Sequence, residues 1–82
     1  MKILVCIYVP AISKKFDVWI PDFLSIKEII SLIVKAVKEL SNSKYVSSGF
    51  EFLCLKEKNL LLKDNATLKE YGVRNGDNLI LI

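Results

Sequence analysis

The sequence predicts an α+β fold: a single domain over residues 1–82, in which one amphipathic helix packs across one face of a sheet. Apolar residues with helical spacing occupy the middle of the chain, and short strand-like apolar runs lie on both sides of them. The last run, Leu79–Ile82, follows the turn signal Asn75-Gly76-Asp77. Because this run is almost wholly apolar, we expect an interior strand that is paired on both sides.

Two strands at the start of the chain form a predicted hairpin. Residues Lys2–Val9 are rich in β-branched side chains and end at Pro10. Residues Phe16–Ile20 alternate between two faces, and the connection at 11–15 is short enough for a hairpin. After the helix we expect strands at Phe50–Leu55, Leu60–Leu62 and Leu79–Ile82, with a turn at 56–59 and a capped turn beginning at Thr67.

The helix is predicted from Ile26 to Leu40. Ser25 is a favourable N-cap, and Glu28 three residues later completes a capping box. The apolar residues fall on one face about 100° wide, at positions 26, 29, 30, 33, 36, 37 and 40. That width suits a helix packed on a sheet better than the alternative, a helix lying on a membrane surface.

Composition narrows the class of protein. With 52% hydrophobic and 26% charged residues, the chain is not of the disordered class. Its net charge of +3 comes from scattered lysines and one arginine, Arg74, which argues against a nucleic-acid reader with an arginine-rich patch. No segment is long and apolar enough to insert stably in a membrane, and no signal-peptide cleavage pattern follows the first strand. We therefore expect a cytoplasmic protein.

No catalytic or metal-binding constellation is visible, and we expect no cofactor. The carboxylates do not cluster in sequence, and Asp77 is expected to satisfy backbone donors of its turn. Cys6 and Cys54 lack the spacing of a metal or redox motif, and the chain has no histidine to activate a thiol. Both cysteines are expected to be free and at least half-buried.

The strand alternation predicts two faces for the sheet. Facing the helix, we expect Ile3, Val5, Ile7, Phe16, Val18, Ile20, Leu53, Leu55, Leu79 and Leu81. On the outer face we expect Leu4, Cys6, Tyr8, Trp19, Phe52, Cys54, Ile80 and Ile82. Since no second helix is available to cover them, this apolar and aromatic surface is typical of a protein interface. In the alternative register of the third strand, Phe50, Phe52 and Cys54 point inward.

The order strand-strand-helix-strand-strand-strand resembles the ubiquitin-like β-grasp. The closing segment is similar to that of ubiquitin-like proteins, through Thr67-Leu68, Tyr71, Val73, Leu79 and Leu81. This resemblance implies a mixed five-stranded sheet, whose last strand lies between the first and the third. It also implies a short 3₁₀ segment before that strand.

Among ubiquitin-like proteins, the chain resembles the YukD/EsaB family of type VII (WXG100) secretion systems of Gram-positive bacteria. The resemblance covers nearly the whole chain and rests on Pro21, Leu24, Ile26-Lys27, Ile30, Leu60-Leu61-Leu62, Tyr71-Gly72-Val73, Asn75-Gly76-Asp77 and Leu79. Its motifs are structural, and the aromatic and cysteine content of the first three strands departs from the family. It implies a non-enzymatic accessory protein, cytoplasmic or peripheral at the machinery, whose partner is a membrane subunit or the ATPase.

The chain also departs from ubiquitin-like modifiers and sulfur carriers, which end in a flexible Gly-Gly tail that enters an activating enzyme. Here the sequence ends at Ile82. We therefore expect an adaptor that acts by contact and is not conjugated, and whose outer face binds a secretion component or a second copy as a homodimer. The alternatives are a carrier or modifier protein, and a small nucleic-acid-binding domain that uses the helix lysines Lys27, Lys35 and Lys38.

Overall fold

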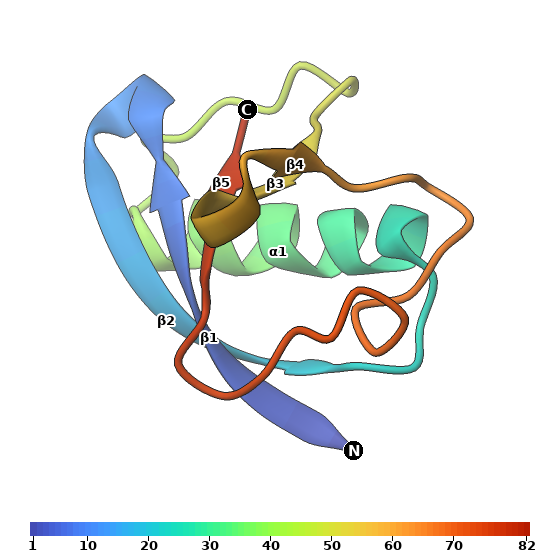
Figure 1. Cartoon of the computed structure of the whole chain (residues 1–82). Coiled ribbons are helices and arrows are strands. Elements are labelled where there is room, and N and C mark those ends of the chain that lie inside the picture. Colours follow the sequence, from blue (N-terminus) through green and yellow to red (C-terminus); the bar gives the residue numbers. More distant parts are fainter.

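The computed structural model describes residues 1–82 and contains a mixed five-stranded sheet with one helix, α1, across one face (Figure 1). The strand order is β2-β1-β5-β3-β4, and only the β1–β5 pair is parallel. The predicted α+β class and the central place of the last strand are confirmed. The elements are β1 (Lys2–Val9), β2 (Lys14–Pro21), α1 (Ile26–Leu40), β3 (Leu53–Leu55), β4 (Leu60–Leu61), β5 (Asn78–Leu81) and the 3₁₀ turns η1 (Pro10–Ile12) and η2 (Lys56–Lys58).

The turn before β5 is attached directly to β1. The backbone N–H of Leu4 donates to Oδ1 of Asn75 at 2.8 Å, and the N–H of Gly76 donates to the carbonyl of Leu4 at 2.8 Å. Gly76 has a φ of 87°, which favours glycine. Asp77 accepts from the backbone N–H of Arg74 at 2.9 Å, as the sequence predicts. These contacts fix where β5 begins relative to β1.

Helix α1 begins and ends at the predicted residues. The hydroxyl of Ser25 accepts the backbone N–H of Glu28 at 3.3 Å and donates to the carboxylate of Glu28 at 3.0 Å. One prediction for the apolar stripe is wrong, because Leu40 is 56% exposed. The core at this end of the helix is closed by Val37 and by Tyr45 from the following loop. With 15 residues, α1 falls short of what a membrane crossing requires, and no other α-helix is present.

A second capping pair shapes the segment before β5. The backbone N–H of Glu70 donates to the Thr67 hydroxyl at 3.1 Å, and the N–H of Thr67 donates to the Glu70 carboxylate at 2.9 Å. The resemblance implies a 3₁₀ segment here, but residues 68–72 form successive hydrogen-bonded turns instead, after an isolated bridge between Thr67 and Ser25. Leu68, inside these turns, is fully buried and helps close the core.

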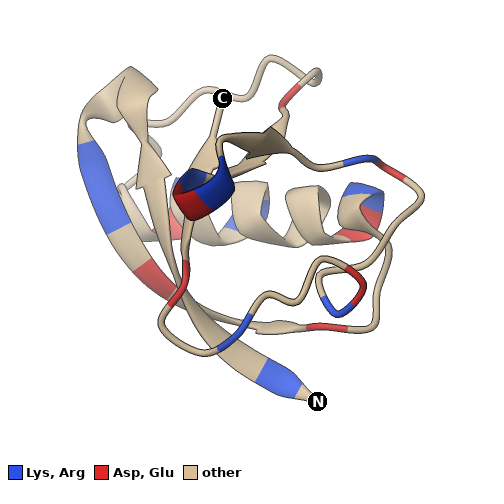
Figure 2. Cartoon of the chain, viewed as in Figure 1, with Lys and Arg blue, Asp and Glu red and all other residues tan.

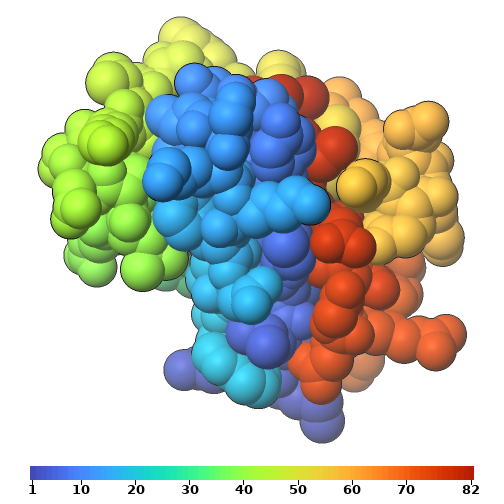
Figure 3. All heavy atoms as spheres, turned by 90° about the vertical axis from the view of Figure 1, so that its left-hand side faces the viewer, coloured from blue at the N-terminus to red at the C-terminus, as the bar shows by residue number.

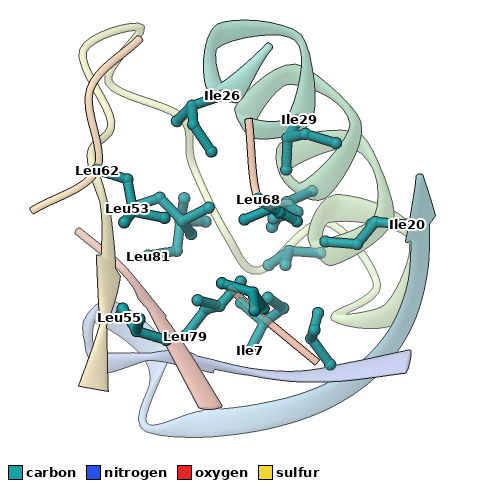
Figure 4. Close-up of a cluster of buried hydrophobic side chains, with 14 of the residues drawn as sticks. Ile7, Ile20, Ile26, Ile29, Leu53, Leu55, Leu62, Leu68, Leu79 and Leu81 are labelled. Carbon is teal, nitrogen blue, oxygen red and sulfur yellow. The ribbon is translucent and has the colours of Figure 1, made fainter. Parts of the chain in front are cut away.

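The core is the contact between α1 and one face of the sheet (Figure 4). The helix contributes Ile26, Ile29, Ile33 and Val37, all fully buried. From the predicted inward set, Phe16 and Val18 are only partly buried because β2 lies at the sheet edge. The rest of that set is buried: Ile3, Val5, Ile7, Ile20, Leu53, Leu55, Leu79 and Leu81. The expected register of the third strand is therefore correct, and the alternative with Phe52 and Cys54 inside is wrong.

The boundaries of several strands differ from the prediction. The third strand covers only Leu53–Leu55, because side chains of the preceding serines bond the backbone: Ser47 accepts from Gly49 and Ser48 from Phe50. These bonds keep residues 47–50 out of the sheet and leave Phe50 82% exposed. The first hairpin connection is also shorter than expected, since β2 already begins at Lys14, and β4 ends one residue early.

Replacing Ile33 by alanine should lower the free energy of unfolding by about 3 kcal/mol, because the lost methyl groups leave a cavity in a fully buried site. Chemical denaturation measures this change. Leu32→Ala is the matched control on the same helix, where the side chain is 42% exposed, and it should change stability by less than about 1 kcal/mol. Similar losses for the two variants would contradict this placement of the helix.

Candidate protein-interaction surface

Seven of the eight predicted interface residues lie on the outer face of the sheet, away from α1. The eighth, Phe52, comes just before β3 and also lines a groove beside the helix. None of the eight is fully buried. Trp19, Phe52 and Ile82 are 59%, 50% and 56% exposed, while the other five are half-buried: Leu4, Cys6, Tyr8, Cys54 and Ile80. The period-2 alternation of the strands produces this placement. Many of the apolar side chains that are not part of the core therefore lie on the outer face.

One group of these residues forms a row across four strands. Tyr8 on β1 is paired with Ile80 on β5, Ile80 with Cys54 on β3, and Cys54 with Leu61 on β4. Directly opposed residues on one face have Cβ atoms about 5 Å apart, so these side chains are in lateral contact. In the next row, Phe52 and Ile82 exchange two backbone hydrogen bonds of 2.6 and 3.0 Å. We call these six residues the Ile80 cluster: Tyr8, Phe52, Cys54, Leu61, Ile80 and Ile82.

Leu61 is a member of this cluster that sequence reasoning missed. The run Leu60-Leu61-Leu62 contains no alternation that would distinguish outward from inward residues. Its pairing with Cys54 places Leu61 on the outer face, where it is 49% exposed, whereas Leu62 is buried. The pairing partner, and not the local pattern, decides the orientation of this strand.

A polar row separates the Ile80 cluster from the remaining predicted residues. Asp17, Cys6 and Asn78 are paired across β2, β1 and β5. Beyond this row, Trp19 is paired with Leu4 and forms a second, smaller apolar spot. The predicted set is thus brought together as two groups, and not as one continuous patch.

The turn η2 reinforces this polar row and lies in front of β5 in Figure 1. Glu57 accepts the backbone N–H of Asn78 at 3.1 Å and its side-chain amide at 3.0 Å. The hydrogen bond from the Asn78 side chain holds the pKa of Glu57 below its usual value. Glu57 therefore carries a negative charge beside the apolar cluster. The exposed carboxylate of Asp17 lies in the same row on β2, and Figure 2 shows acidic residues on both η2 and β2.

Both cysteines are free and half-buried, as the sequence predicts. They lie on different strands, with β5 between β1 and β3. Cys6 belongs to the polar row and Cys54 to the Ile80 cluster. Nowhere in the chain do three or more histidine, cysteine or carboxylate side chains come together in a way that could hold a metal ion.

A groove of about 370 Å³ lies between α1 and the segment that leads into β3. Its apolar lining comes from Ile30 and Val34 on the helix and from Phe50 and Phe52 on the segment, while Lys27 and Asp64 lie among the polar residues lining it. The sequence did not indicate this groove, because residues 50–52 were expected to continue the strand. Phe52 belongs to both the groove and the Ile80 cluster.

Beside this groove, Glu51 organises the loop after the helix. Its carboxylate accepts the Tyr45 hydroxyl at 2.7 Å, the Ser47 hydroxyl at 2.6 Å and the Ser48 backbone N–H at 3.2 Å. Burial alone would raise the pKa of Glu51, but these hydrogen bonds outweigh it and lower the pKa. Burial, together with the hydrogen bond to Glu51 and its negative charge, raises the pKa of Tyr45 to about 12.

Solved structures identify this fold as that of ubiquitin-like proteins. The ubiquitin-like domain of Plasmodium falciparum Dsk2 superposes with a TM-score of 0.72 at 23% identity, with all of both chains covered. Caldiarchaeum subterraneum ubiquitin gives a TM-score of 0.71 at 18% identity, covering 100% of this chain and 92% of the other. At such identities the likeness shows the fold alone. No curated protein sequence matches the chain.

The sequence profile described as "WXG100 protein secretion system (Wss), protein YukD" matches residues 4–81. The chain therefore belongs to the YukD family and is a ubiquitin-like protein of a type VII secretion system. A structural neighbour is the ubiquitin-like domain of the Mycobacterium tuberculosis type VII secretion system protein EccD1. It has a TM-score of 0.79 and 18% identity, with 100% of this chain and 98% of the other covered.

Replacing Glu51 by glutamine should make the free energy of unfolding less dependent on pH in the acidic range. The pKa of Glu51 is lowered in the folded state, so the ionised carboxylate stabilises the fold above its unfolded pKa. That contribution disappears as the pH falls through the folded pKa. Urea unfolding from neutral pH down to about 3 should therefore show a steeper acid loss for the parent protein than for Glu51→Gln.

Glu39→Gln is the control for this prediction, because the Glu39 side chain is exposed and makes no hydrogen bond. Its pH profile should follow that of the parent protein. Parallel losses of stability for Glu51→Gln and the parent between neutral and acid pH would contradict a lowered pKa of Glu51 in the folded state.

Proposed function

We propose that this protein is a non-enzymatic adaptor that binds another component of the secretion system through the outer sheet face, without being conjugated to it. The observation that carries this proposal is the Ile80 cluster. Its six apolar or aromatic side chains lie together on four strands, and no second helical layer is present to cover them. A contiguous apolar surface on the open side of a two-layer domain is typical of a protein interface.

Binding energy in such an interface usually comes from a few central residues. Ile80 is central here, because it is paired on one side with Tyr8 and on the other with Cys54. Tyr8 adds an aromatic ring with a polar tip, and the exposed ring of Phe52 extends the surface toward the groove beside α1. Trp19 and Leu4 form a second contact on the far side of the polar row.

The charges around the cluster indicate the chemistry of the partner. Glu57 and Asp17 place carboxylates beside the apolar side chains, and Glu57 stays ionised through its bonds with Asn78. A complementary surface would be apolar at its centre, with lysine, arginine or amide donors facing these two carboxylates. Such a partner could contact the Ile80 cluster alone or reach across the polar row to Trp19.

Membership of the YukD family supports a partner within the secretion machinery, either a membrane subunit or the ATPase. The ubiquitin-like domain of EccD1 is part of a type VII secretion system protein, which supports a role in assembly contacts. We propose a cytoplasmic protein that is held at the machinery by this contact. No residue is given a catalytic role, since the candidate surface consists of apolar side chains and free thiols in a chain without histidine.

Ile80→Asp should weaken binding to the partner at least about tenfold, because a buried carboxylate would replace the central apolar contact. Purified cytoplasmic portions of the membrane subunits and of the ATPase serve as candidate partners in a pull-down, followed by titration calorimetry. Trp19→Ala should weaken binding as well if the partner reaches across the polar row. Circular dichroism checks that both variants are folded.

Leu32→Asp is the matched control, since Leu32 is an exposed apolar residue on the helix, away from the outer face. It should leave the affinity unchanged. Full binding by Ile80→Asp would contradict the Ile80 cluster as the interface. The non-covalent character is tested separately, because intact-mass analysis of the protein purified from its host should show the unmodified chain. A covalent adduct with another protein would favour the carrier or modifier hypothesis instead.

A further inference from the structure

The sheet has one long unpaired edge. Strand β2 stands first in the strand order and pairs only with β1, along all of its 8 residues. The opposite edge, β4, has only 2 residues. Figure 3 looks at this side of the molecule and shows the atoms of the β1–β2 hairpin at the front, with no other segment across them. A long edge of this kind offers free backbone groups to another strand.

The pairing with β1 determines which backbone groups are free. The N–H of Asp22 donates to the carbonyl of Met1 at 2.9 Å, so this pair is hydrogen-bonded. Hydrogen-bonded pairs alternate along an antiparallel ladder, which places Ile20, Val18 and Phe16 in bonds with β1. The N–H and C=O groups of Lys15, Asp17 and Trp19 therefore point away from the sheet. They are available to a further strand.

The charged side chains along this edge are self-complementary when two copies of the strand run antiparallel. Lys15 and Asp17 are both exposed and lie two residues apart on the outer face, with Phe16 between them on the face of α1. In an antiparallel pair of two copies centred on Phe16, Lys15 of each copy lies opposite Asp17 of the other. Both pairs are then of opposite charge, and each is also a hydrogen-bonded backbone pair.

Neighbouring registers lack this complementarity. A pair centred on Asp17 sets two carboxylates directly opposite each other, and a pair centred on Lys15 sets two ammonium groups opposite each other. A pair centred on Val18 places Asp17 opposite Trp19 and leaves both charges without a partner. Because like charges in directly opposed positions are destabilising, the Phe16-centred register is favoured over these three.

We propose that two copies of this chain associate edge to edge through β2, in the antiparallel register centred on Phe16, and form one continuous sheet. Phe16 then meets Phe16 of the second copy at a non-hydrogen-bonded position, where opposed side chains come closest. Phe16 is only partly buried in the single copy, so this contact covers apolar surface that is otherwise exposed to water. The dimer leaves the Ile80 cluster free on both copies and does not depend on the function proposed for that cluster. It engages Asp17, so in the dimer Glu57 is the carboxylate that remains for a partner.

Charge exchange tests the register. Lys15→Asp alone would place two carboxylates opposite each other at both pairs, and Asp17→Lys alone would place two ammonium groups there. Each single variant should weaken the dimer at least about tenfold in sedimentation equilibrium. The double variant Lys15→Asp/Asp17→Lys restores opposite charges and should recover the dissociation constant to within about threefold. A double variant as weak as the single ones would overturn the register.

Disulfide trapping tests the contact between the two copies of Phe16 independently. In a Cys6→Ser/Cys54→Ser background, Phe16→Cys should form a covalent dimer under mild oxidation, because opposed Cα atoms at such a position lie about 4.5 Å apart. Val18→Cys is the matched control. In this register Val18 lies opposite Lys14 of the second copy, so the two Val18 positions are about 13 Å apart.

Trapping through Phe16→Cys but not through Val18→Cys supports the proposal. Equal trapping at both positions, or preferential trapping through Val18→Cys, would overturn it. So would a single 9.3 kDa species for the parent chain at the highest concentration reached in sedimentation. Since Phe16→Cys removes a partly buried ring, its stability is checked by circular dichroism. The exposed charge variants test the same register without touching the core.

Discussion

The position of β5 between β1 and β3 is the constraint on which the rest of the structure depends. It is the only strand that brings the two halves of the chain together, with parallel pairing on one side and antiparallel pairing on the other. Its register is fixed before the strand begins, where Asn75 and Gly76 bond the backbone of Leu4. A slip of one residue would move Leu79 and Leu81 out of the core and Ile80 into it. The core and the candidate interface therefore rest on the same few hydrogen bonds.

The outer surface follows from the same geometry. A sheet covered by one helix can bury only one of its faces, and strict alternation along β1 and β5 gives the other face an equal number of side chains. In this chain many of those side chains are apolar, although the fold does not require it. Asn78, held by Glu57, shows that a polar residue is compatible with the same strand. The apolar residues around Ile80 are thus not explained by folding, which is why we interpret them as a binding surface.

Sequence reasoning succeeded where local patterns carry the information. The bounds of α1 followed from Ser25 and the apolar stripe, and the faces of β1 and β2 followed from alternation. It failed where the decisive partner is distant in sequence. The outward orientation of Leu61 and the polar row through Asn78 both depend on cross-strand neighbours. The late start of β3 at Leu53 has a different cause, because serine hydroxyls accept from backbone N–H groups only two residues further along the chain. The alternation within each strand was enough to predict which residues point outward. Their division into two groups could be seen only once the register between the strands was known.

The edge and the outer face are related through symmetry. In the dimer proposed for β2, the twofold axis stands perpendicular to the continuous sheet, so the outer faces of both copies lie on the same side. Two Ile80 clusters would then face one direction, together with two copies of Trp19 near the junction. A partner presenting two binding sites with matching spacing would gain avidity without any new contact, because the second binding event becomes intramolecular. A weak contact at each cluster would then suffice for stable attachment to a symmetric assembly, whereas a single copy would dissociate readily. Only the dimer presents two Ile80 clusters to such a partner. Because Lys15 and Asp17 hold the dimer together, they would also determine how tightly the protein attaches to that partner.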